Sequence, residues 1–311
     1  MDPVTVTDAV LAEEFAEHRG HLIGVAYRLT STLSDAEDAV QESWLRLSGL
    51  DDGKRTEIRD LRAWLTTVVG RICLDRLRSA TVRRERYVGE WLPEPIVTPY
   101  GTPVSDDPLE TVVRNDEVRM AALVVLDRLT PEQRVAFVLH DAFGVPFGEI
   151  AEMLGCTEAT ARQHASRGRR AAADADPPPR QPAAEQRAIV EQFLAAIASG
   201  DVNAVAQLLH PDAILIGDSD GKARTSRRVM VGADKIFRFF QGLLDKYGPH
   251  RLSGLRVVLV NGDVGIAAPD LPAEDGYLAL SRRVSTFAVR DGRVTAIYDI
   301  VNPDKLVRVE F

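Results

Sequence analysis

The sequence predicts a multidomain protein in which two all-α parts precede a C-terminal α+β domain. Residues 10–80 and 108–173 carry apolar side chains at helical spacing, whereas residues 184–311 combine helical patterns with strand-like runs and tight-turn dipeptides. Two proline-rich runs separate these parts, and 311 residues fit two or three domains better than one. The predicted domains and linkers span residues 1–87, 88–107, 108–173, 174–183 and 184–311.

The composition is that of an ordinary globular protein. Hydrophobic residues make up 45% of the chain, and no apolar stretch reaches the roughly 18 residues that cross a bilayer. Cys73 and Cys156 lie outside any CxxC or His-rich setting, which favours two free thiols in a reducing compartment. We therefore expect a soluble cytoplasmic protein with no membrane partner.

The net charge of −8 is distributed unevenly. Residues 1–60 contain 13 acidic and 6 basic residues, whereas residues 71–86 and 162–170 are locally basic. An acidic N-terminal region predicts a basic protein partner there. The two local basic runs are compatible with DNA contacts at those positions.

The first part is predicted to be a helical bundle. Ser34 and Glu37 have the spacing of a capping box, and the helix after them buries one apolar stripe. A second helix begins near Leu61 and carries Arg71 and Arg78 on its polar face. Trp64 lies on its apolar stripe, so core packing is favoured over base stacking.

The run from residue 88 to 107 contains four prolines and cannot continue a helix. Trp91, Leu92 and Ile96 are large apolar residues that a solvated linker would not need, so we expect them to dock on a neighbouring surface. Asp107 before Pro108 predicts the next helix start. The second proline-rich run, 174–183, predicts an extended spacer.

The second helical part ends in a helix-turn-helix pattern. Thr130 to Gln133 forms a second capping box, and helices over 147–154 and 158–173 flank a Gly155-Cys156-Thr157 turn. Four polar side chains of the last helix project outward and can bind base edges or phosphates: Arg162, Gln163, Ser166 and Arg167. An ordinary helical hairpin with a solvated basic face is the alternative.

The C-terminal part is predicted to hold helices over 184–199, 202–209 and 233–247. Three dipeptides that favour two-residue hairpins separate its strand-like runs: Asp220-Gly221, Asn261-Gly262 and Asp291-Gly292. The pattern predicts a curved antiparallel sheet with helices on one face, which gives an α+β cone.

Both helical parts resemble the extracytoplasmic-function (ECF) sigma factors of bacterial transcription initiation. The run DAEDAVQE at 35–42, with AYRL at 26–29 and LRAWL at 61–65, is similar to their region 2, and residues 140–170 are similar to region 4. The resemblance implies a region 2 helical bundle and a region 4 helix-turn-helix. A ligand-sensing, one-component helix-turn-helix regulator is the alternative function, and the DAEDAVQE run argues against it.

The resemblance implies core RNA polymerase and promoter DNA as partners. The β′ clamp helices of the polymerase would bind the region 2 helix through Asp35, Asp38, Gln41 and Glu42. DNA at the −10 element would meet the next helix through Arg71, Arg76 and Arg78, although many ECF members carry Asn at the position of Arg71. DNA at the −35 element would meet Arg162, Gln163, Ser166 and Arg167.

The C-terminal part resembles SnoaL-like (NTF2-like) domains, and the combination resembles the SigJ-type subgroup of ECF sigma factors. The shared runs are WLPEP at 91–95, DSDGK at 218–222 and NPDKL at 302–306, the second departing from the usual DGGGK at two positions. The resemblance implies that this domain controls the sigma factor without a separate anti-sigma protein. It assigns interdomain, regulatory contacts to Trp91, Leu92, Pro93, Asp218, Lys222, Asn302, Pro303 and Asp304.

Domains of this class can also be enzymes or hold a small molecule in the cone. The candidates for acid–base chemistry are His210, Asp212, Tyr298 and Asp299, but their spacing shows no acid–base pair. The sequence therefore predicts no enzyme activity, and an enzyme tethered to DNA is the less favoured alternative. No metal-ligand or phosphate-loop spacing appears, so we expect no cofactor. A small-molecule ligand of the C-terminal domain stays an open alternative.

Overall fold

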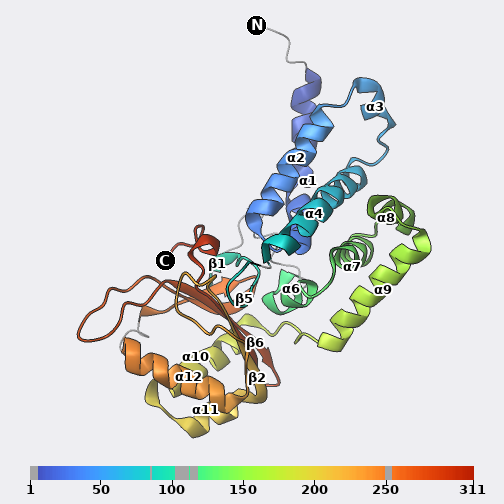
Figure 1. The fold of residues 1–311 in the computed structure, drawn as a ribbon. Helices are drawn as coiled ribbons and strands as arrows, with labels where there is room; N and C mark the ends of the chain where they lie inside the picture. The colour runs from blue at the N-terminus through green and yellow to red at the C-terminus, as the bar shows by residue number, and fades with distance from the viewer. Residues whose placement is uncertain (1–5, 85, 102–111, 113–117, 249–253) are drawn as a thin grey trace. The chain divides into compact units, whose positions relative to one another are not determined.

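The computed structural model describes residues 6–84, 86–101, 112, 118–248 and 254–311, so the helix start expected at Asp107 lies outside the described residues. The chain forms two compact units (Figure 1). The first, here called the helical unit, comprises Met1–Glu85, Ser105–Val118 and Ala122–Asp176. The second, here called the α+β unit, comprises Arg86–Val104, Arg119–Ala121 and Pro177–Phe311.

The N-terminal half of the helical unit is a bundle of α1 (Val6–Thr30), α2 (Leu33–Ser48), the short α3 (Asp52–Glu57) and α4 (Leu61–Arg84). The apolar stripe of α2 is buried as its spacing predicts: Leu33, Ala36, Ala39, Val40, Ser43 and Leu47. The capping box expected at Ser34 is wrong, because α2 begins at Leu33, two residues before the start that a Ser34 N-cap would give. Thr32 is its N-cap and donates its hydroxyl hydrogen to Asp35 at 2.9 Å.

The C-terminal half of the helical unit contains all but the first two residues of α6 (Met120–Leu126), together with α7 (Pro131–Phe137), a π-helical turn (Val138–Ala142), α8 (Phe147–Leu154) and α9 (Glu158–Ala175). The capping box at Thr130 is confirmed. The Thr130 hydroxyl accepts a hydrogen bond from the Gln133 backbone amide, and the Gln133 side chain accepts one from the Thr130 backbone amide. Gly155 ends α8 with φ 66°, a left-handed conformation that glycine adopts without steric cost. The predicted helix-turn-helix is therefore formed.

The α+β unit consists of one curved sheet and the helices that pack on it. Its helices are α10 (Ala183–Ser199), α11 (Val202–Leu208) and α12 (Ala233–Tyr247), and a short 3-10 turn (Pro303–Lys305) follows the last strand. The strands are β1 (Val97–Pro99), β2 (Leu209–Asp218), β3 (Met230–Val231), β4 (Arg256–Val260), β5 (Asp263–Ala268), β6 (Arg283–Arg290) and β7 (Arg293–Ile300). Side chains of α10, α11 and α12 pack with strand residues in one hydrophobic core, which includes Phe193, Ile236 and Phe287.

The sheet order is β1-β4-β5-β6-β7-β2-β3, and β2 pairs with β7 in parallel. The sheet is therefore mixed, and the expectation of a purely antiparallel sheet is wrong. Two of the expected hairpins are present, with Asn261-Gly262 between β4 and β5 and Asp291-Gly292 between β6 and β7. Asp220-Gly221 forms a turn at positive φ but sits in the longer loop between β2 and β3.

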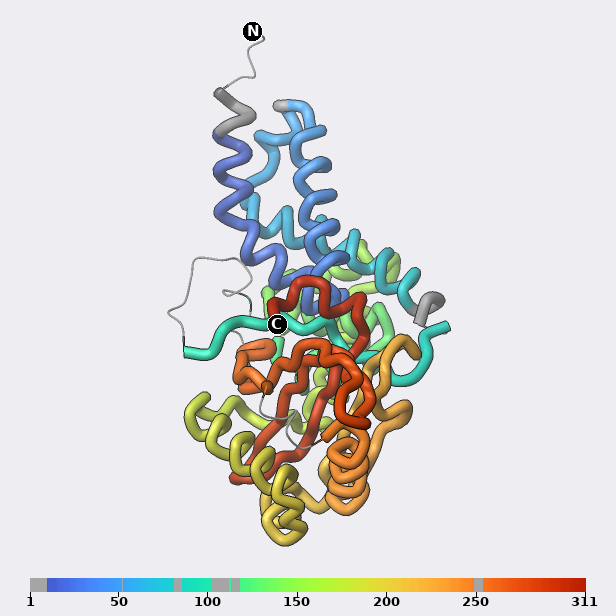
Figure 2. Tube along the Cα trace, turned by 90° about the vertical axis from the view of Figure 1, so that its left-hand side faces the viewer, coloured from blue at the N-terminus to red at the C-terminus, as the bar shows by residue number. Residues whose placement is uncertain are grey.

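The proline-rich run after α4 contributes a strand of the C-terminal sheet. Val97 to Pro99 form β1, an edge strand antiparallel to β4. A proline is tolerated at such an edge because its missing N–H costs no ladder bond there. Figure 2 shows this cyan segment beside the orange and red segments of the α+β unit. The described part of the run, residues 88–101, therefore belongs to the C-terminal fold.

Candidate functional site

The outer face of α9 carries the side chains predicted to read the duplex. All four are exposed: Arg162, Gln163, Ser166 and Arg167. The opposite face is buried against the rest of the helix-turn-helix through Ala161, Ala165 and Gly168. A β-carbon at Gly168 would come within 2.6 Å of the β-carbon of Phe137, so only glycine allows this close packing of α9 on α7. The small residues on one face thus position the polar residues on the other.

Local contacts orient the start of this polar face. Arg162 pairs with Glu158 at 2.8 Å, and its guanidinium lies 4.8 Å from the ring centroid of Phe147. The ion pair is exposed, so it orients Arg162 weakly and leaves it able to exchange a carboxylate for a phosphate.

The acidic face predicted to bind polymerase lies on α2. Asp38 and Gln41 are exposed, and Asp35 and Glu42 are partly buried. Arg76 of α4 lies 3.0 Å from Asp35, 3.4 Å from Asp38 and 3.9 Å from Glu42. The structure therefore brings a predicted DNA contact, Arg76, together with the predicted polymerase contacts. In this arrangement Arg76 neutralises part of the acidic face.

The other two predicted −10 contacts of α4 face carboxylates from the second half of the helical unit. Arg78 pairs with Glu132 at 3.1 Å, and Arg71 lies 3.9 Å from Glu152. Thr67, on the same helix, donates to Glu149 at 2.8 Å. The predicted DNA-facing side of α4 is thus engaged by acidic residues of α7 and α8.

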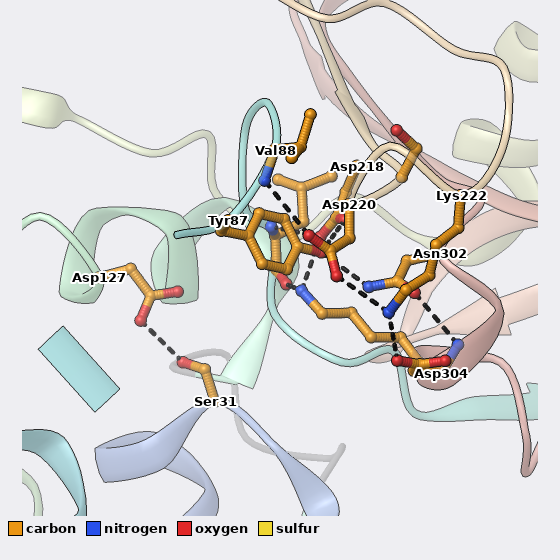
Figure 3. Close-up of polar contacts among 12 residues, drawn as sticks. Ser31, Tyr87, Val88, Asp127, Asp218, Asp220, Lys222, Asn302 and Asp304 are labelled. Carbon is orange, nitrogen blue, oxygen red and sulfur yellow. Dashed lines mark hydrogen bonds and ion pairs between the residues drawn. The ribbon is translucent and has the colours of Figure 1, made fainter. Parts of the chain in front are cut away.

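A buried arginine joins the two halves of the helical unit, and the sequence analysis did not identify it. The Arg134 side chain is 1% exposed; it donates to the backbone oxygen of Arg28 at 2.9 Å and pairs with Asp127 and Ser31. The hydroxyl of Ser31 in turn donates to Asp127 at 3.2 Å (Figure 3). Since α1 ends two residues after Arg28, the cation also lies near the negative end of that helix.

In the α+β unit, the three runs that resemble the SigJ-type subgroup meet around the carboxylate of Asp218. We call the group formed by Tyr87, Trp91, Leu92, Asp218, Asn302 and Lys305 the linker-docking cluster. Asp218 is fully buried and accepts hydrogen bonds from the Tyr87 hydroxyl and, at 2.7 Å, from the Leu92 amide. Figure 3 shows Tyr87, Asp218 and Asn302 pointing toward one another.

Lys305 neutralises this buried carboxylate. Its ammonium lies 2.6 Å from Asp218, donates to the Leu92 carbonyl and sits 3.8 Å from the ring centroid of Trp91. The side chains of Lys305 and Asp218 are 9% and 0% exposed. A buried ion pair persists only with hydrogen bonds on the remaining donors and acceptors, and here the linker supplies them.

Tyr87 completes the cluster from the linker side. Asn302 donates its amide hydrogen to the Tyr87 hydroxyl at 2.7 Å, and that hydroxyl donates to Asp218. Burial raises the pKa of the Tyr87 phenol far above its ordinary range, and the negative charge of Asp218 raises it further. Tyr87 therefore acts as a neutral donor, which suits a buried carboxylate.

Three further charged residues of the DSDGK and NPDKL runs, Asp220, Lys222 and Asp304, are partly or fully exposed. Lys222 pairs with Asp304 at 2.6 Å and with Asp220 at 2.9 Å, while Asp220 accepts a bond from the Val88 amide at 3.2 Å. The hydrogen bond from Lys222 lowers the pKa of Asp220, and Asp304 raises the pKa of Lys222. These exposed pairs surround the buried linker-docking cluster.

Two further contacts hold chain segments on the α+β unit. Asn261, in the β4–β5 turn, accepts a bond from the Ile96 amide at 3.1 Å. Arg119 forms a buried ion pair with Asp263 at 2.8 Å and also donates to the carbonyl of Pro178. The chain before and after the 102–117 segment is therefore held by the same domain.

The residues considered for catalysis do not assemble. Asp299 lines a pocket of the α+β unit together with Ser285 and Arg283. His210 and Asp212 are exposed, and the His210 ring accepts a hydrogen bond from the nearby Asp212 amide at 3.2 Å. Tyr298 is buried and does not line that pocket. No histidine faces Asp299 among the lining residues.

Within the described residues, the structure contains neither a metal site nor a disulfide. No group of three or more His, Cys, Asp or Glu side chains there could hold a metal ion. Cys73 and Cys156 are free thiols, and burial raises the pKa of Cys73. None of the helices of that part of the chain is long and apolar enough to cross a membrane.

Comparisons with known proteins agree with the arrangement of helices. The Sigma-70 region 2 family matches residues 15–83, and the Sigma-70 region 4 family matches residues 119–171. The sequence is 51% identical to the ECF RNA polymerase sigma factor SigJ of Mycobacterium tuberculosis, over 94% of this chain and 92% of that protein. The chain belongs to the ECF RNA polymerase sigma factors. It is therefore a sigma factor that directs promoter-specific transcription initiation.

The likeness of this ECF sigma factor to its relatives extends through the third domain. The SnoaL-like domain family matches residues 190–297. The sequence is also 34% identical to the probable ECF RNA polymerase sigma factor SigI of M. tuberculosis, over 93% of this chain and 92% of that protein. The crystal structure of M. tuberculosis SigJ superimposes with a TM-score of 0.80 at 48% identity, covering 95% of this chain and 98% of that one. The expected SigJ-type architecture is confirmed.

Sequence reasoning missed several residues of these sites. Lys305 lies inside the NPDKL run and Tyr87 four residues before WLPEP, yet neither was selected. A lysine within an otherwise apolar or turn-forming run was the available signal for a buried ion pair. Nothing in the sequence pattern pointed to the pairing of Arg119 with Asp263 or to Arg134.

Proposed function

We propose that this sigma factor is controlled by its own SnoaL-like domain, which keeps the linker between regions 2 and 4 docked. The same proposal assigns core polymerase binding to α2, −10 DNA to α4 and −35 DNA to α9. Action on RNA polymerase and chromosomal DNA would place the protein in the cytoplasm. The observation that carries the proposal is the buried linker-docking cluster around Asp218 and Lys305.

The charge of α2 supports the polymerase assignment. Asp35, Asp38, Gln41 and Glu42 lie on the partly exposed side of that helix, in the most acidic part of the chain. An acidic face steers and docks a basic partner, here the β′ clamp helices. Arg76 sits among three of these side chains, so polymerase binding would compete with an internal cation.

The exposure of α9 supports the −35 assignment. The polar residues of α9 stand clear of the buried stripe, at the end of a helix-turn-helix that enters the major groove in DNA-binding proteins. Arg167 has no ion pair among the described residues, and Arg162 has only an exposed one with Glu158. Both are therefore available to phosphates or base edges.

Docking of the linker supports control by the third domain. A free linker of about 20 residues can extend to roughly 70 Å, so regions 2 and 4 could adopt many separations. In the structure, residues 86–101 instead form an edge strand and a buried cluster on the α+β unit. Two DNA-binding modules gain affinity together only when their linker lets both engage, so holding the linker limits joint promoter binding.

The contacts of α4 support a low-activity docked state. Arg71 and Arg78 face Glu152 and Glu132, so binding of −10 DNA at these arginines requires the carboxylates to leave. We infer that release of the linker allows the two halves of the helical unit to separate. Docking is therefore proposed to repress, and undocking to activate.

Promoter-dependent transcription in vitro with core polymerase tests this proposal. Lys305→Met, which removes the cation of the linker-docking cluster, should raise initiation above that of the unaltered chain. The matched control is Lys222→Met, in the exposed pair with Asp304, and should leave initiation nearly unchanged. Equal or lower initiation by the Lys305 variant would refute the repressive role.

Two further comparisons separate the parts of the proposal. Chains that end before Pro303 or at Asp176 remove the 3-10 turn or the whole domain, and both should alter initiation. Capture of core polymerase should be weakened by Asp38→Arg on α2 and kept by Glu17→Arg, an exposed acidic position on α1. Capture of polymerase by both variants would remove the α2 assignment while leaving the role of the linker untouched.

A further inference from the structure

One loop of the α+β unit is strongly basic, although the chain as a whole is acidic. Residues 219–229 join β2 to β3 and contain four basic side chains and one acidic one, whereas the whole chain has a net charge of −8. Arg224, Arg227 and Arg228 of this loop are exposed. Arg86, at the start of the linker segment of the same unit, is exposed as well. We call these four side chains the arginine patch.

The loop and the linker segment that carries Arg86 contact each other. The Val88 amide donates to Asp220 at 3.2 Å, and Figure 3 shows these two residues side by side. A β-carbon on Gly89 would lie 3.7 Å from the carbonyl oxygen of Arg227, so the two backbones also run close together there. Because Arg86 is two residues from Val88, both parts of the arginine patch belong to one region of the surface.

Short polar side chains fix the loop on the sheet. Thr225 donates to Asp299 of β7 at 2.6 Å, and Ser226, which is 7% exposed, donates to the Arg228 carbonyl. A β-carbon at Gly217 of β2 would lie 2.7 Å from the Ser226 carbonyl oxygen, so the loop backbone packs directly on that strand. The backbone from which the arginines project is therefore preorganised, which lowers the entropic cost of binding a partner.

Three carboxylates beside the arginine patch are paired with lysines. Lys305 neutralises Asp218, and Lys222 pairs with Asp220 and Asp304. None of the four arginines of the patch forms an ion pair within the part of the chain that the structure describes. Each guanidinium therefore keeps its N–H donors for solvent or for a ligand.

The chemistry of the arginine patch fits the phosphates of double-stranded DNA. Guanidinium groups bind phosphate oxygens bidentately, and a group of like positive charges complements the dense negative charge of a duplex backbone. The order of residues favours the same partner. Arg86 follows the end of α4, the proposed −10 helix, by two residues, which span at most about 7 Å; this support rests on the proposed function. We propose that the arginine patch binds the phosphate backbone of duplex DNA.

This assignment adds a DNA contact on the SnoaL-like domain to those of α4 and α9. Phosphate contacts hold a protein on the duplex without reading its sequence, so the arginine patch would add affinity at any promoter. Removal of the domain would then remove DNA affinity together with the restraint on the linker. The domain would thus both restrain the sigma factor and help to bind its promoter.

Fluorescence anisotropy of a fluorescein-labelled DNA duplex of arbitrary sequence, titrated with the full chain, tests the proposal. Arg227→Gln combined with Arg228→Gln should weaken binding about tenfold at low salt, and the slope of log affinity against log salt concentration should fall by about two. Arg86→Gln alone should lower the slope by about one, because it removes a single phosphate contact.

The matched control removes two other exposed basic side chains of the same unit. Lys246→Gln combined with Arg293→Gln changes the net charge equally, at the far ends of α12 and β7. Each lies about 20 Å along its element from the end nearer the basic loop. The control should bind the duplex as the unaltered chain does. Equal loss in the patch and control variants would show an effect of net charge alone and overturn the proposal, as would absence of binding by the unaltered chain.

Two further measurements separate the arginine patch from a structural effect and from another partner. Arg227→Lys combined with Arg228→Lys keeps both charges and should retain the salt slope; a loss as large as with glutamine would overturn the phosphate assignment. If the glutamine variant binds the duplex normally but captures less core polymerase, the partner is an acidic protein surface and the DNA assignment is wrong. Duplex binding is measured without transcription, so its failure is distinct from failure of linker control.

Discussion

The linker-docking cluster and the contacts along α4 use charge in opposite ways. In the cluster, the side chains of Lys305 and Asp218 are 9% and 0% exposed, and the linker supplies their remaining hydrogen bonds. Along α4, the side chains of Arg78 and Glu132 are 48% and 30% exposed. A buried pair is costly to break, whereas an exposed pair contributes little and exchanges readily with water, salt or phosphate.

The linker-docking cluster is therefore a durable contact, whereas the ion pairs along α4 are exchangeable. The linker stays on the SnoaL-like domain unless something disrupts a buried ion pair, while the arginines of α4 can leave their carboxylates at small cost. A signal that acts on this protein is therefore most effective at the linker-docking cluster. We expect substitutions to rank in the same order, with the buried linker contact first and the exposed pairs of α4 last.

Lys305→Met should produce the largest loss of local stability. Removal of one partner leaves Asp218 charged and buried, which costs about 3–5 kcal/mol. Hydrogen exchange at the amides of residues 87–99 should report that loss as faster exchange, because these amides depend on docking. The control is Lys222→Met, whose side chain is 42% exposed and whose loss should cost under about 1 kcal/mol. Equal protection in the two variants would contradict the ranking.

Much of the fold could be predicted from local pattern. The amphipathic spacing of residues 233–247 and the glycine at position 155 specify α12 and the turn of the helix-turn-helix through short-range geometry. The parallel pairing of β2 with β7 could not be predicted, because it joins segments more than 70 residues apart in sequence. The incorporation of Val97 to Pro99 as an edge strand is equally non-local.

Arg134→Met should have the next largest effect, and it lies in the helical unit. The substitution removes the hydrogen bonds from the Arg134 side chain to the Arg28 carbonyl, Ser31 and Asp127. The Asp127 side chain, however, is 10% exposed and can bind water instead. We expect a cost of about 1.5–3 kcal/mol, less than for Lys305. Thermal unfolding followed by circular dichroism would measure it. A loss as large as that of the Lys305 variant would show that water does not compensate Asp127 when Arg134 is removed.

The residues of the candidate sites also differ in whether local sequence pattern could predict them. The exposed residues of α9 could be predicted because helical spacing alone separates them from Ala161 and Ala165. Arg76 was assigned to DNA from the family resemblance and its charge, and only the packing of α4 on α2 places it among carboxylates. Buried pairs such as Arg119 with Asp263 depend on tertiary structure and leave no pattern in the sequence.

Alkaline pH should weaken linker docking through Tyr87. The pKa of this phenol is raised in the docked state, so the docked state holds the proton more tightly than a free linker does. Its contribution is complete below a pH of about 10, the ordinary pKa of tyrosine, and is lost as the pH rises above that value. The difference in tyrosinate absorbance between the unaltered chain and Tyr87→Phe should show one phenol that titrates above the others. Titration together with the exposed tyrosines would contradict burial of Tyr87.

Glu132→Ala should have the smallest effect on stability and a clear effect on DNA binding. The pair with Arg78 is exposed, so its loss should cost about 0–1 kcal/mol, and thermal unfolding should barely change. The freed Arg78 can then neutralise a phosphate, which should raise affinity for −10 DNA and steepen its salt dependence by about one counterion. Glu191→Ala, in an exposed pair with Arg187 on α10, removes the same charge without freeing an arginine of α4 and serves as control. If both variants bind DNA alike, Arg78 does not contact the promoter, and the exposed pairs of α4 serve only to hold the two halves of the helical unit together.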